Sequence, residues 1–382
     1  MHKAFLTNIV KFINISYTTF HPEVIAISEQ FKSPLVKPKY FEYMDILRIL
    51  ATFAVVFLHV SSQNRKASVI DSFNWYVFNI QEAGTRWAVP VFVMISGAVF
   101  LGRKQPIEKL YKKNIFRILT ALIFWSGFYA IAKLITSHDL QKAAKQFITG
   151  NFHQWFLFMI IGLYMIVPFL NKIVESKKLT EYFLLIYLAL TIVLPHSISL
   201  FSLYHPFLGS AFKTALANMN YHFALGYSGY FVLGYYLNNI KISEKAEKII
   251  YALGVLGYLI TAFGTIAICY GKETENSMLF TNTTPNVFMM ALAVFVFGKM
   301  RLGKLHLNGK SKATISRLSK YSFGIYLIHP FIIDEFRILL NFTTVSFNPL
   351  LSVPVLFLAV SIISLALSAA INHIPYLNKY IV

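Results

Sequence analysis

Ten apolar stretches, most of them close to 20 residues long, recur along the chain and constrain its fold more than any other feature. A helix needs about 20 apolar residues to cross the ~30 Å of bilayer hydrocarbon. Only helices and closed barrels satisfy backbone groups in lipid, and the alternation of a barrel strand is absent here. We therefore expect an all-α polytopic membrane protein of about ten transmembrane helices, near residues 45–63, 84–102, 115–136, 154–171, 181–196, 220–238, 249–270, 284–300, 321–340 and 350–371.

Composition agrees with a membrane protein. Charged residues make up 13% of the 382 residues, against about 25% in a soluble domain. The net charge of +19 could suggest a nucleic-acid partner, but the lysines lie in short segments between apolar runs, so we expect no nucleic-acid binding. The single cysteine, Cys269, excludes an internal disulfide and a cysteine metal cluster.

The distribution of Lys and Arg predicts the topology. Counting loop by loop, 25 of the 35 basic residues fall on one side and 9 on the other, with Arg48 inside the first span. Because basic residues accumulate on the cytoplasmic side, we expect both termini in the cytoplasm. Residues 1–43 are interpreted as a cytoplasmic tail and residues 44–382 as the membrane domain, so the first helix runs outward.

Two ionisable side chains share one face of this first helix. Arg48 and His59 are 11 positions apart, which places them within about 20° of each other and about 16.5 Å apart along the axis. A snorkelling Arg48 and a helix-end His59 would be the plain alternative. An ionisable residue within a span usually faces a protein interior or a wet cavity, and two on one face favour a functional site.

Four motifs resemble integral-membrane acyltransferase family 3. The Arg48–His59 pair resembles the R/K-x10-H signature of that family, in which ten residues separate a cation from a histidine. Three further segments are similar to family motifs in the same order: residues 90–97 (PVFVMISG), residues 153–168 (HQWFL, then LY and P) and residues 321–329 (YSFGIYLIH). The short loops resemble the branch that contains enterobacterial common-antigen O-acetyltransferases.

The resemblance implies an enzyme of the bacterial cytoplasmic (inner) membrane. It implies an O-acyltransferase, most simply an O-acetyltransferase, that moves an acyl group from acyl-CoA to a sugar hydroxyl of a surface polysaccharide or its lipid-linked precursor. Acetyl-CoA is then a donor substrate, and no permanently bound cofactor is expected. The R-x-x-R motif of the family is not matched cleanly, because residues 112–117 read KKNIFR; Arg117 and Lys113 are the remaining donor-binding candidates.

The chemistry of acyl transfer assigns roles to the pair on the first helix. A neutral imidazole is suited to take the proton of a hydroxyl as it attacks, so His59 is the candidate catalytic base. Arg48 offers a planar set of donors for an anionic donor substrate and is the second candidate catalytic residue. Asp45, three positions earlier, would pair with Arg48 and orient it.

The candidate residues for acceptor binding are Arg86, His153, Trp155, Tyr326 and His329. Three of them have a structural alternative: an interfacial anchor for Arg86, an aromatic-belt position for Trp155, and for His329, which precedes Pro330, hydrogen bonding to carbonyls freed at a helix bend. For Ser96-Gly97 we favour close helix packing over a catalytic serine.

Two other functions stay open. A transporter or flippase for lipid-linked glycans would use a similar wet cavity and similar cations, although two related halves are not evident. A structural partner of a glycan synthase would not require His59. No metal site is expected, because H-x3-H and H-E-x-x-H spacings are missing, and the chain carries no P-loop.

Overall fold

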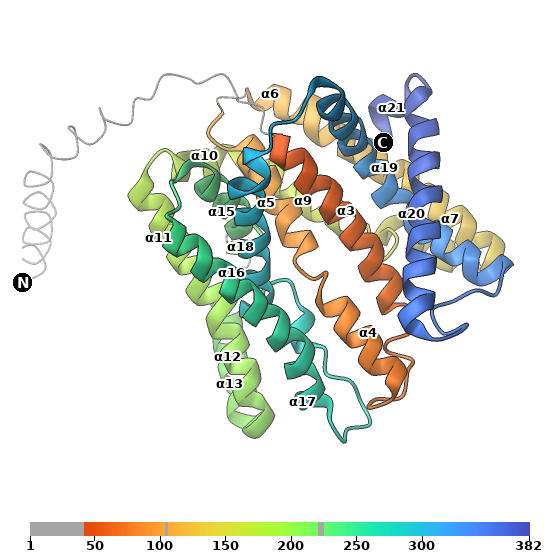
Figure 1. Ribbon diagram of the computed structural model, residues 1–382, viewed down its shortest axis with the longest axis horizontal. Helices are drawn as coiled ribbons and strands as arrows, with labels where there is room; N and C mark the ends of the chain where they lie inside the picture. Colours follow the sequence, from red (N-terminus) through yellow and green to blue (C-terminus); the bar gives the residue numbers. More distant parts are fainter. Residues whose placement is uncertain (1–41, 104–105, 221–224) are drawn as a thin grey trace, which may run out of the picture. The chain divides into compact units, whose positions relative to one another are not determined.

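The computed structural model describes residues 42–103, 106–220 and 225–382, and the regular elements in these ranges are helices (Figure 1). The first half contains α3 (Glu42–Ser62), α4 (Phe73–Ala83), α5 (Ala88–Phe100), α6 (Ile107–Lys109), η1 (Leu110–Ile115), α7 (Phe116–Ser137), α8 (Leu140–Thr149), α9 (Trp155–Met165), α10 (Val167–Val174) and α11 (Lys177–Tyr187). The second half contains η2 (Leu188–Val193), α12 (Leu194–Tyr204), α13 (Pro206–Ala217), α15 (Ser228–Asn239), α16 (Glu244–Leu259), η3 (Ile260–Gly264), α17 (Thr265–Cys269), η4 (Met278–Phe280), α18 (Pro285–Met300), η5 (Leu302–Lys304), α19 (Gly309–Leu339), α20 (Pro349–His373) and α21 (Leu377–Tyr380). The predicted all-α class is confirmed, whereas the predicted tail lies outside the described residues apart from Glu42 and Tyr43, which begin α3.

Seven helical stretches in the described residues are long and apolar enough to cross a membrane, as a multi-pass membrane protein requires. They are Glu42–Ser62, Phe73–Phe100, Ile107–Ser137, Lys177–Tyr204, Glu244–Cys269, Met278–Lys304 and Pro349–His373. The pair α9–α10 would make an eighth, but it bends by 59° at Ile166, where Pro168 follows in the first turn of α10.

The predicted count of ten includes two more segments. The segment 220–238 corresponds to α15, which is 12 residues long, and residues 221–224 are outside the described ranges. The segment 321–340 lies in α19, which has the length of a span but carries polar residues such as Ser322 and His329 along its buried side. The count of ten and the cytoplasmic placement of the termini therefore stay predictions.

Helix α3 lies at the centre of the membrane unit, packed against α5, α19 and α20 (Figure 1). Its first half buries Leu47 and Ala51 in one apolar cluster, and its second half buries Val56 and Val60 in a second cluster. Because these residues recur at helical spacing, α3 contributes to both apolar clusters. Among the polar residues of α3, Asp45, Thr52 and Ser61 are buried.

Close backbone contact joins α15 to α5, which packs against α3. A Cβ on Gly97 would collide with the backbone of Phe231, and a Cβ on Gly234 would collide with the backbone of Met94. Small residues at such crossings allow membrane helices to approach closely. The hydroxyl of Ser96 donates to the Phe92 carbonyl at 2.9 Å. The packing interpretation of Ser96-Gly97 is therefore confirmed.

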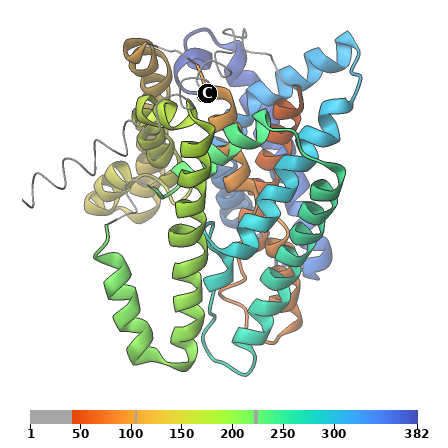
Figure 2. The same ribbon diagram turned by 90° about the vertical axis from the view of Figure 1, so that its left-hand side faces the viewer.

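The span Lys177–Tyr204 contrasts with this centre. Only 17% of its most apolar stretch is buried, and α12 and α13 run side by side as a hairpin (Figure 2). Its exposed apolar surface is what a lipid-facing helix needs. The polar residues that concern function lie instead along α3 and its immediate neighbours.

Candidate functional site

Arg48 forms a closed polar triangle with Asp45 and Ser319 near the start of α3. Its Nη1 donates to Asp45 Oδ1 at 2.7 Å and to Ser319 Oγ at 2.8 Å, and Ser319 Oγ donates to the same Asp45 oxygen at 2.6 Å. The predicted pairing of Asp45 with Arg48 is thus confirmed. The triangle holds the guanidinium by one nitrogen, while 33% of the Arg48 side chain is exposed. In the part of the chain that the structure describes, its other N–H groups have no hydrogen-bond acceptor and are available to a ligand.

The two predicted donor-binding residues lie differently. Arg117, in α7, donates from Nη2 to the carbonyl oxygen of Val382 at 2.7 Å. Tyr164 of α9 is within electrostatic reach of both Arg48 and Arg117, so the structure brings these two guanidiniums to one end of the bundle. Lys113 is an exposed residue of η1. It is therefore placed at the surface rather than among these groups.

His59 and His329 form a direct imidazole pair near the end of α3. His59 Nδ1 and His329 Nε2 are 2.7 Å apart, and the two ring planes differ by 4°. The ring centroids are 5.0 Å apart, which matches the N···N distance plus the centre-to-nitrogen distances of two imidazoles. The rings therefore meet edge to edge in one plane, and a hydrogen bond rather than face-to-face stacking joins them.

The surroundings of His329 determine where the protons of this pair lie. His329 Nδ1 is 3.1 Å from the carbonyl oxygen of Ile325, which can only accept, so a neutral His329 carries its proton on Nδ1. Its Nε2 is then an acceptor, and His59 must donate from Nδ1. The lone pair of a neutral His59 is thereby assigned to Nε2. Among the described residues no group hydrogen-bonds to this atom, and His59 as a whole residue is half-buried.

The bond from His329 to Ile325 also bears on the alternative considered for His329. Pro330 follows it inside α19, and the ring does return a hydrogen bond to a carbonyl one turn earlier. Pro330 leaves the carbonyl of Tyr326, not that of Ile325, without its N–H partner, so the helix-bend role stays a prediction, and the same ring contacts His59. The two roles are compatible because they use opposite nitrogens of one imidazole.

A third imidazole, His153, lies beside the pair. Its ring centroid is 5.8 Å from that of His329 and 5.3 Å from that of Tyr326. The side chain is 1% exposed, and neither ring nitrogen has a hydrogen-bond partner of good geometry in the described residues. The Tyr326 hydroxyl donates to the His153 backbone carbonyl. The structure thus gathers three of the five predicted acceptor-binding residues, His153, Tyr326 and His329, around His59.

Arg86 joins this region through an ion-pair network. It donates to Glu82, which is 0% exposed, and its guanidinium lies 4.7 Å from the ring centre of Phe280. Arg86 Nε is buried without a hydrogen-bond partner among the described residues. Its charge is close enough to act on the His59 ring. Arg86 is therefore a cation in the same region as His59, and in the described residues its Nε–H has no acceptor.

Trp155 lies at the edge of the site around His59. It is 39% exposed, and its ring lies 5.7 Å from that of Tyr227. The adjacent Phe156 ring contacts Tyr326 at 5.8 Å. Trp155 is the first residue of α9, and the next residue, Phe156, contacts Tyr326, which lies beside His153. In the described residues no ring contact joins Trp155 to His59 or His329.

Several residues of the site could not be found from the sequence. Ser319 completes the Arg48 triangle from 271 positions away, and the Ile325 carbonyl sets the tautomer of His329. Arg65 and Glu275 hold Glu82 and Arg86 in a common network. Of these contacts, only the Glu82–Arg86 ion pair could be predicted from the sequence, because its i, i+4 spacing places both side chains on one helix face.

The described residues offer no group of three His, Cys, Asp or Glu side chains arranged to hold a metal ion. The three imidazoles do not form one, because His59 and His329 use facing nitrogens on each other. What this arrangement can do is accept a proton at His59 Nε2, close to a buried cation and to aromatic rings.

Comparison with known families places this geometry in context. A family model described as an acyltransferase domain, of acyltransferase family 3, matches residues 41–373. No match was found among curated proteins or among solved structures. The matched range is most of the chain and includes every candidate site residue, so the family resemblance is confirmed, while the O-acetyltransferase branch stays a prediction. The chain is therefore a membrane acyltransferase and belongs to acyltransferase family 3.

Proposed function

We propose that this acyltransferase is an O-acyltransferase of the bacterial cytoplasmic membrane. It transfers an acyl group, most simply acetyl, from acyl-CoA to a sugar hydroxyl of a cell-surface polysaccharide or its lipid-linked precursor. The observation that carries this proposal is the chain of hydrogen bonds from Ile325 through His329 to His59. It leaves the Nε2 lone pair of a half-buried histidine without a hydrogen-bond partner in the described residues, as a hydroxyl-activating base requires.

His59 Nε2 removes the proton of the sugar hydroxyl while the hydroxyl oxygen attacks the thioester carbonyl carbon. The tetrahedral intermediate then breaks its C–S bond, and the imidazolium returns the proton to the departing thiolate. The products are an O-acyl sugar and free CoA, so atoms and charge balance. His329 keeps accepting from His59 Nδ1 throughout, which holds the ring in position.

Arg86 is suited to stabilise the negative charge that develops during this step. The negative charge of the tetrahedral intermediate lies on the former carbonyl oxygen, and a preorganised donor beside it lowers the barrier. Arg86 lies within electrostatic reach of His59 and has an unused Nε–H. The aromatic residues Tyr326 and Trp155 are suited to contact a sugar ring, because aromatic rings present a flat apolar face.

Arg48 is proposed to bind the donor. Its exposed N–H groups favour an anionic or strongly polar ligand, and Arg117 is the second cation at that end. The helical rise from Arg48 to His59 is about 16.5 Å. A donor held at Arg48 and extended along α3 would bring its thioester towards His59, so that a cytoplasmic donor and an extracytoplasmic acceptor meet within one protein.

The product identifies the reaction. Purified full-length protein in detergent, supplied with radiolabelled acetyl-CoA and cell-envelope glycan, is expected to release CoA and to label the glycan. Mass spectrometry of the glycan then names the group transferred. The His59→Ala variant should neither release CoA nor label the glycan. Its matched control is His196→Gln, which changes a histidine of α12, far along the chain from the candidate site. Glycan movement across a vesicle membrane without labelling would favour the flippase alternative instead.

A further inference from the structure

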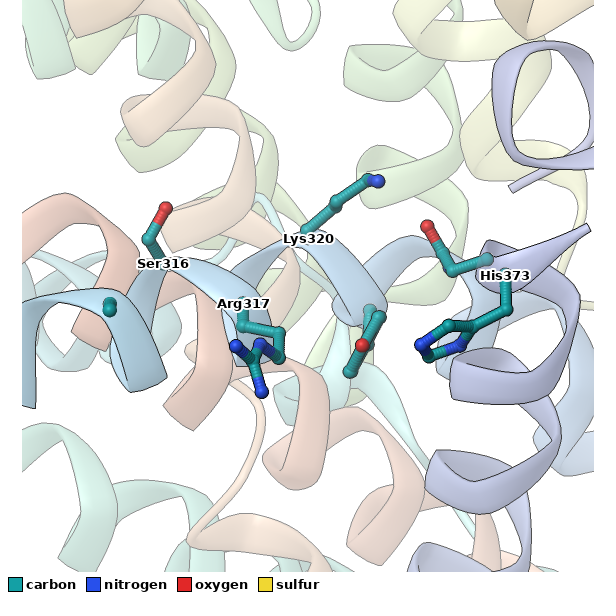
Figure 3. A pocket seen from close by; sticks show the side chains of 7 residues that line it. Ser316, Arg317, Lys320 and His373 are labelled. Atoms are coloured by element: carbon teal, nitrogen blue, oxygen red, sulfur yellow. The ribbon is translucent and has the colours of Figure 1, made fainter. Parts of the chain in front are cut away.

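A pocket of about 600 Å³ lies between α19 and the end of α20, outside the site described above (Figure 3). Ser316, Arg317 and Lys320 follow one another along α19, and His373 faces them from α20. Ala313, Tyr321 and Asn372 complete its lining. By the distribution of Lys and Arg, this end of both helices is on the predicted cytoplasmic side.

The charge of the pocket is uncompensated. No carboxylate lines it, and in the described part of the chain neither Arg317 nor Lys320 takes part in an ion pair. The nearby Lys312, by comparison, is paired with Glu42 at 2.6 Å. Topology alone accounts for cations at this end of the helices. It does not account for two unpaired cations around one cavity.

Uncharged groups of the pocket also lack partners. Asn372 is 7% exposed, and its amide nitrogen donates to the Ser368 carbonyl at 2.9 Å. Its Oδ1 is buried without a hydrogen-bond partner among the described residues. A buried polar atom is costly unless something bonds to it. His373 donates from Nδ1 to Ala369 at 2.7 Å, which leaves its Nε2 for a ligand.

We propose that this pocket binds the phosphate groups of an organic phosphate on the cytoplasmic side. Two unpaired cations and the Ser316 hydroxyl supply donors for phosphate oxygens, and Asn372 Oδ1 accepts from a hydroxyl of the same ligand. The chemistry is shared by two sources, the nucleotide part of the CoA donor and an anionic lipid headgroup. The first source rests on the proposed function. Ser319, which binds Arg48, is the residue next to Lys320 on α19, so the pocket and the Arg48 triangle lie at a similar level along this helix.

Direct binding separates the two sources and does not depend on acyl transfer. The variant is R317Q/K320Q in the full-length protein, and the matched control is K241Q/K245Q, which removes two exposed lysines from the predicted cytoplasmic side outside the pocket. All four residues are exposed, so the fold should be retained, as size-exclusion chromatography and thermal unfolding would show. The affinities for CoA and for 3′-dephospho-CoA are measured, and native mass spectrometry counts bound phosphatidylglycerol.

If the ligand is CoA, R317Q/K320Q raises its Kd about tenfold or more, and the control leaves it unchanged. The wild-type protein then also prefers CoA to 3′-dephospho-CoA if the 3′-phosphate is the group bound. If the ligand is a lipid, CoA affinity is unchanged, and bound phosphatidylglycerol is lost in R317Q/K320Q alone. Unchanged binding of both ligands in the folded variant overturns the proposal. A protein that binds CoA through this pocket but transfers nothing would refute the proposed function alone.

Discussion

Arg48 and Arg65 are two guanidiniums at opposite ends of α3, and their surroundings differ in kind. Arg65 follows the helix, is 2% exposed, and donates to the carboxylates of Glu82 and Glu275 while lying 4.4 Å from the ring centre of Phe280. Burial lowers the pKa of Arg65, and the charge of Glu275 opposes that shift. Arg48 is 33% exposed and is held by one nitrogen.

The difference indicates how a cation that stabilises the fold can be distinguished from one that binds a ligand. Every face of the Arg65 guanidinium is occupied by protein, so it has little left to offer a substrate. Arg48 is oriented by Asp45 and Ser319 but keeps unused N–H groups. A cation that is positioned yet incompletely bonded is what a binding site needs. The following predictions test this contrast.

Replacing Arg65 should have the largest effect on stability. R65M leaves Glu275 buried without its cation and removes one of the two cations of Glu82, which should destabilise the protein by about 3–5 kcal/mol. Thermal unfolding in detergent measures this. R48M is the matched comparison; Arg48 is 33% exposed and Asp45 keeps the hydrogen bond from Ser319 Oγ, so we expect a smaller loss than in R65M. Equal losses in the two variants would remove the distinction.

Replacing His329 should reduce turnover without changing donor binding. H329A deprives His59 Nδ1 of its acceptor, so the ring loses its fixed tautomer, and kcat should fall about 10²-fold at unchanged KM for the donor. H329Q restores an acceptor oxygen and should recover part of the rate. A purely structural role would instead lower the amount of folded enzyme and leave kcat per folded molecule unaltered in both variants.

Replacing Arg48 should weaken donor binding by a smaller amount. R48M removes charge-assisted hydrogen bonds worth about 1.5–3 kcal/mol, which corresponds to a rise of roughly 10- to 100-fold in the Kd of acyl-CoA. Equilibrium binding of a non-hydrolysable acyl-CoA analogue measures this. R48K keeps the charge but not the planar donor set and should fall between R48M and the wild type. Wild-type affinity in R48M would show that the donor binds elsewhere.

The sequence predicts the features that depend on residues close together in the chain. The apolar stretches and their low charge predict membrane helices, and the spacing of Asp45, Arg48 and His59 predicts one polar face on the first of them. The pairing of Asp45 with Arg48 follows from that spacing and is found. Fold class, family and the central helix are therefore accessible without a structure.

The remaining parts depend on contacts between distant segments. The His59–His329 bond joins residues 270 positions apart, and the Arg48–Ser319 bond joins residues 271 positions apart. No periodicity reports such a contact. The sequence also cannot distinguish Arg65 from Arg48, because the carboxylate of Glu275 comes from a loop more than 200 positions away. Even the bend between α9 and α10 shortens a segment that composition alone presents as one continuous span.

The central claim is that His59 is the base and that it does not hold the donor. Single-turnover acyl transfer and the Kd of acetyl-CoA, measured on the same preparation of H59A, test it most directly. The account predicts that the transfer rate falls by about 10²–10⁴-fold or more while the Kd stays within about threefold of the wild type. Transfer at the wild-type rate, or a loss explained entirely by weaker donor binding, would contradict it.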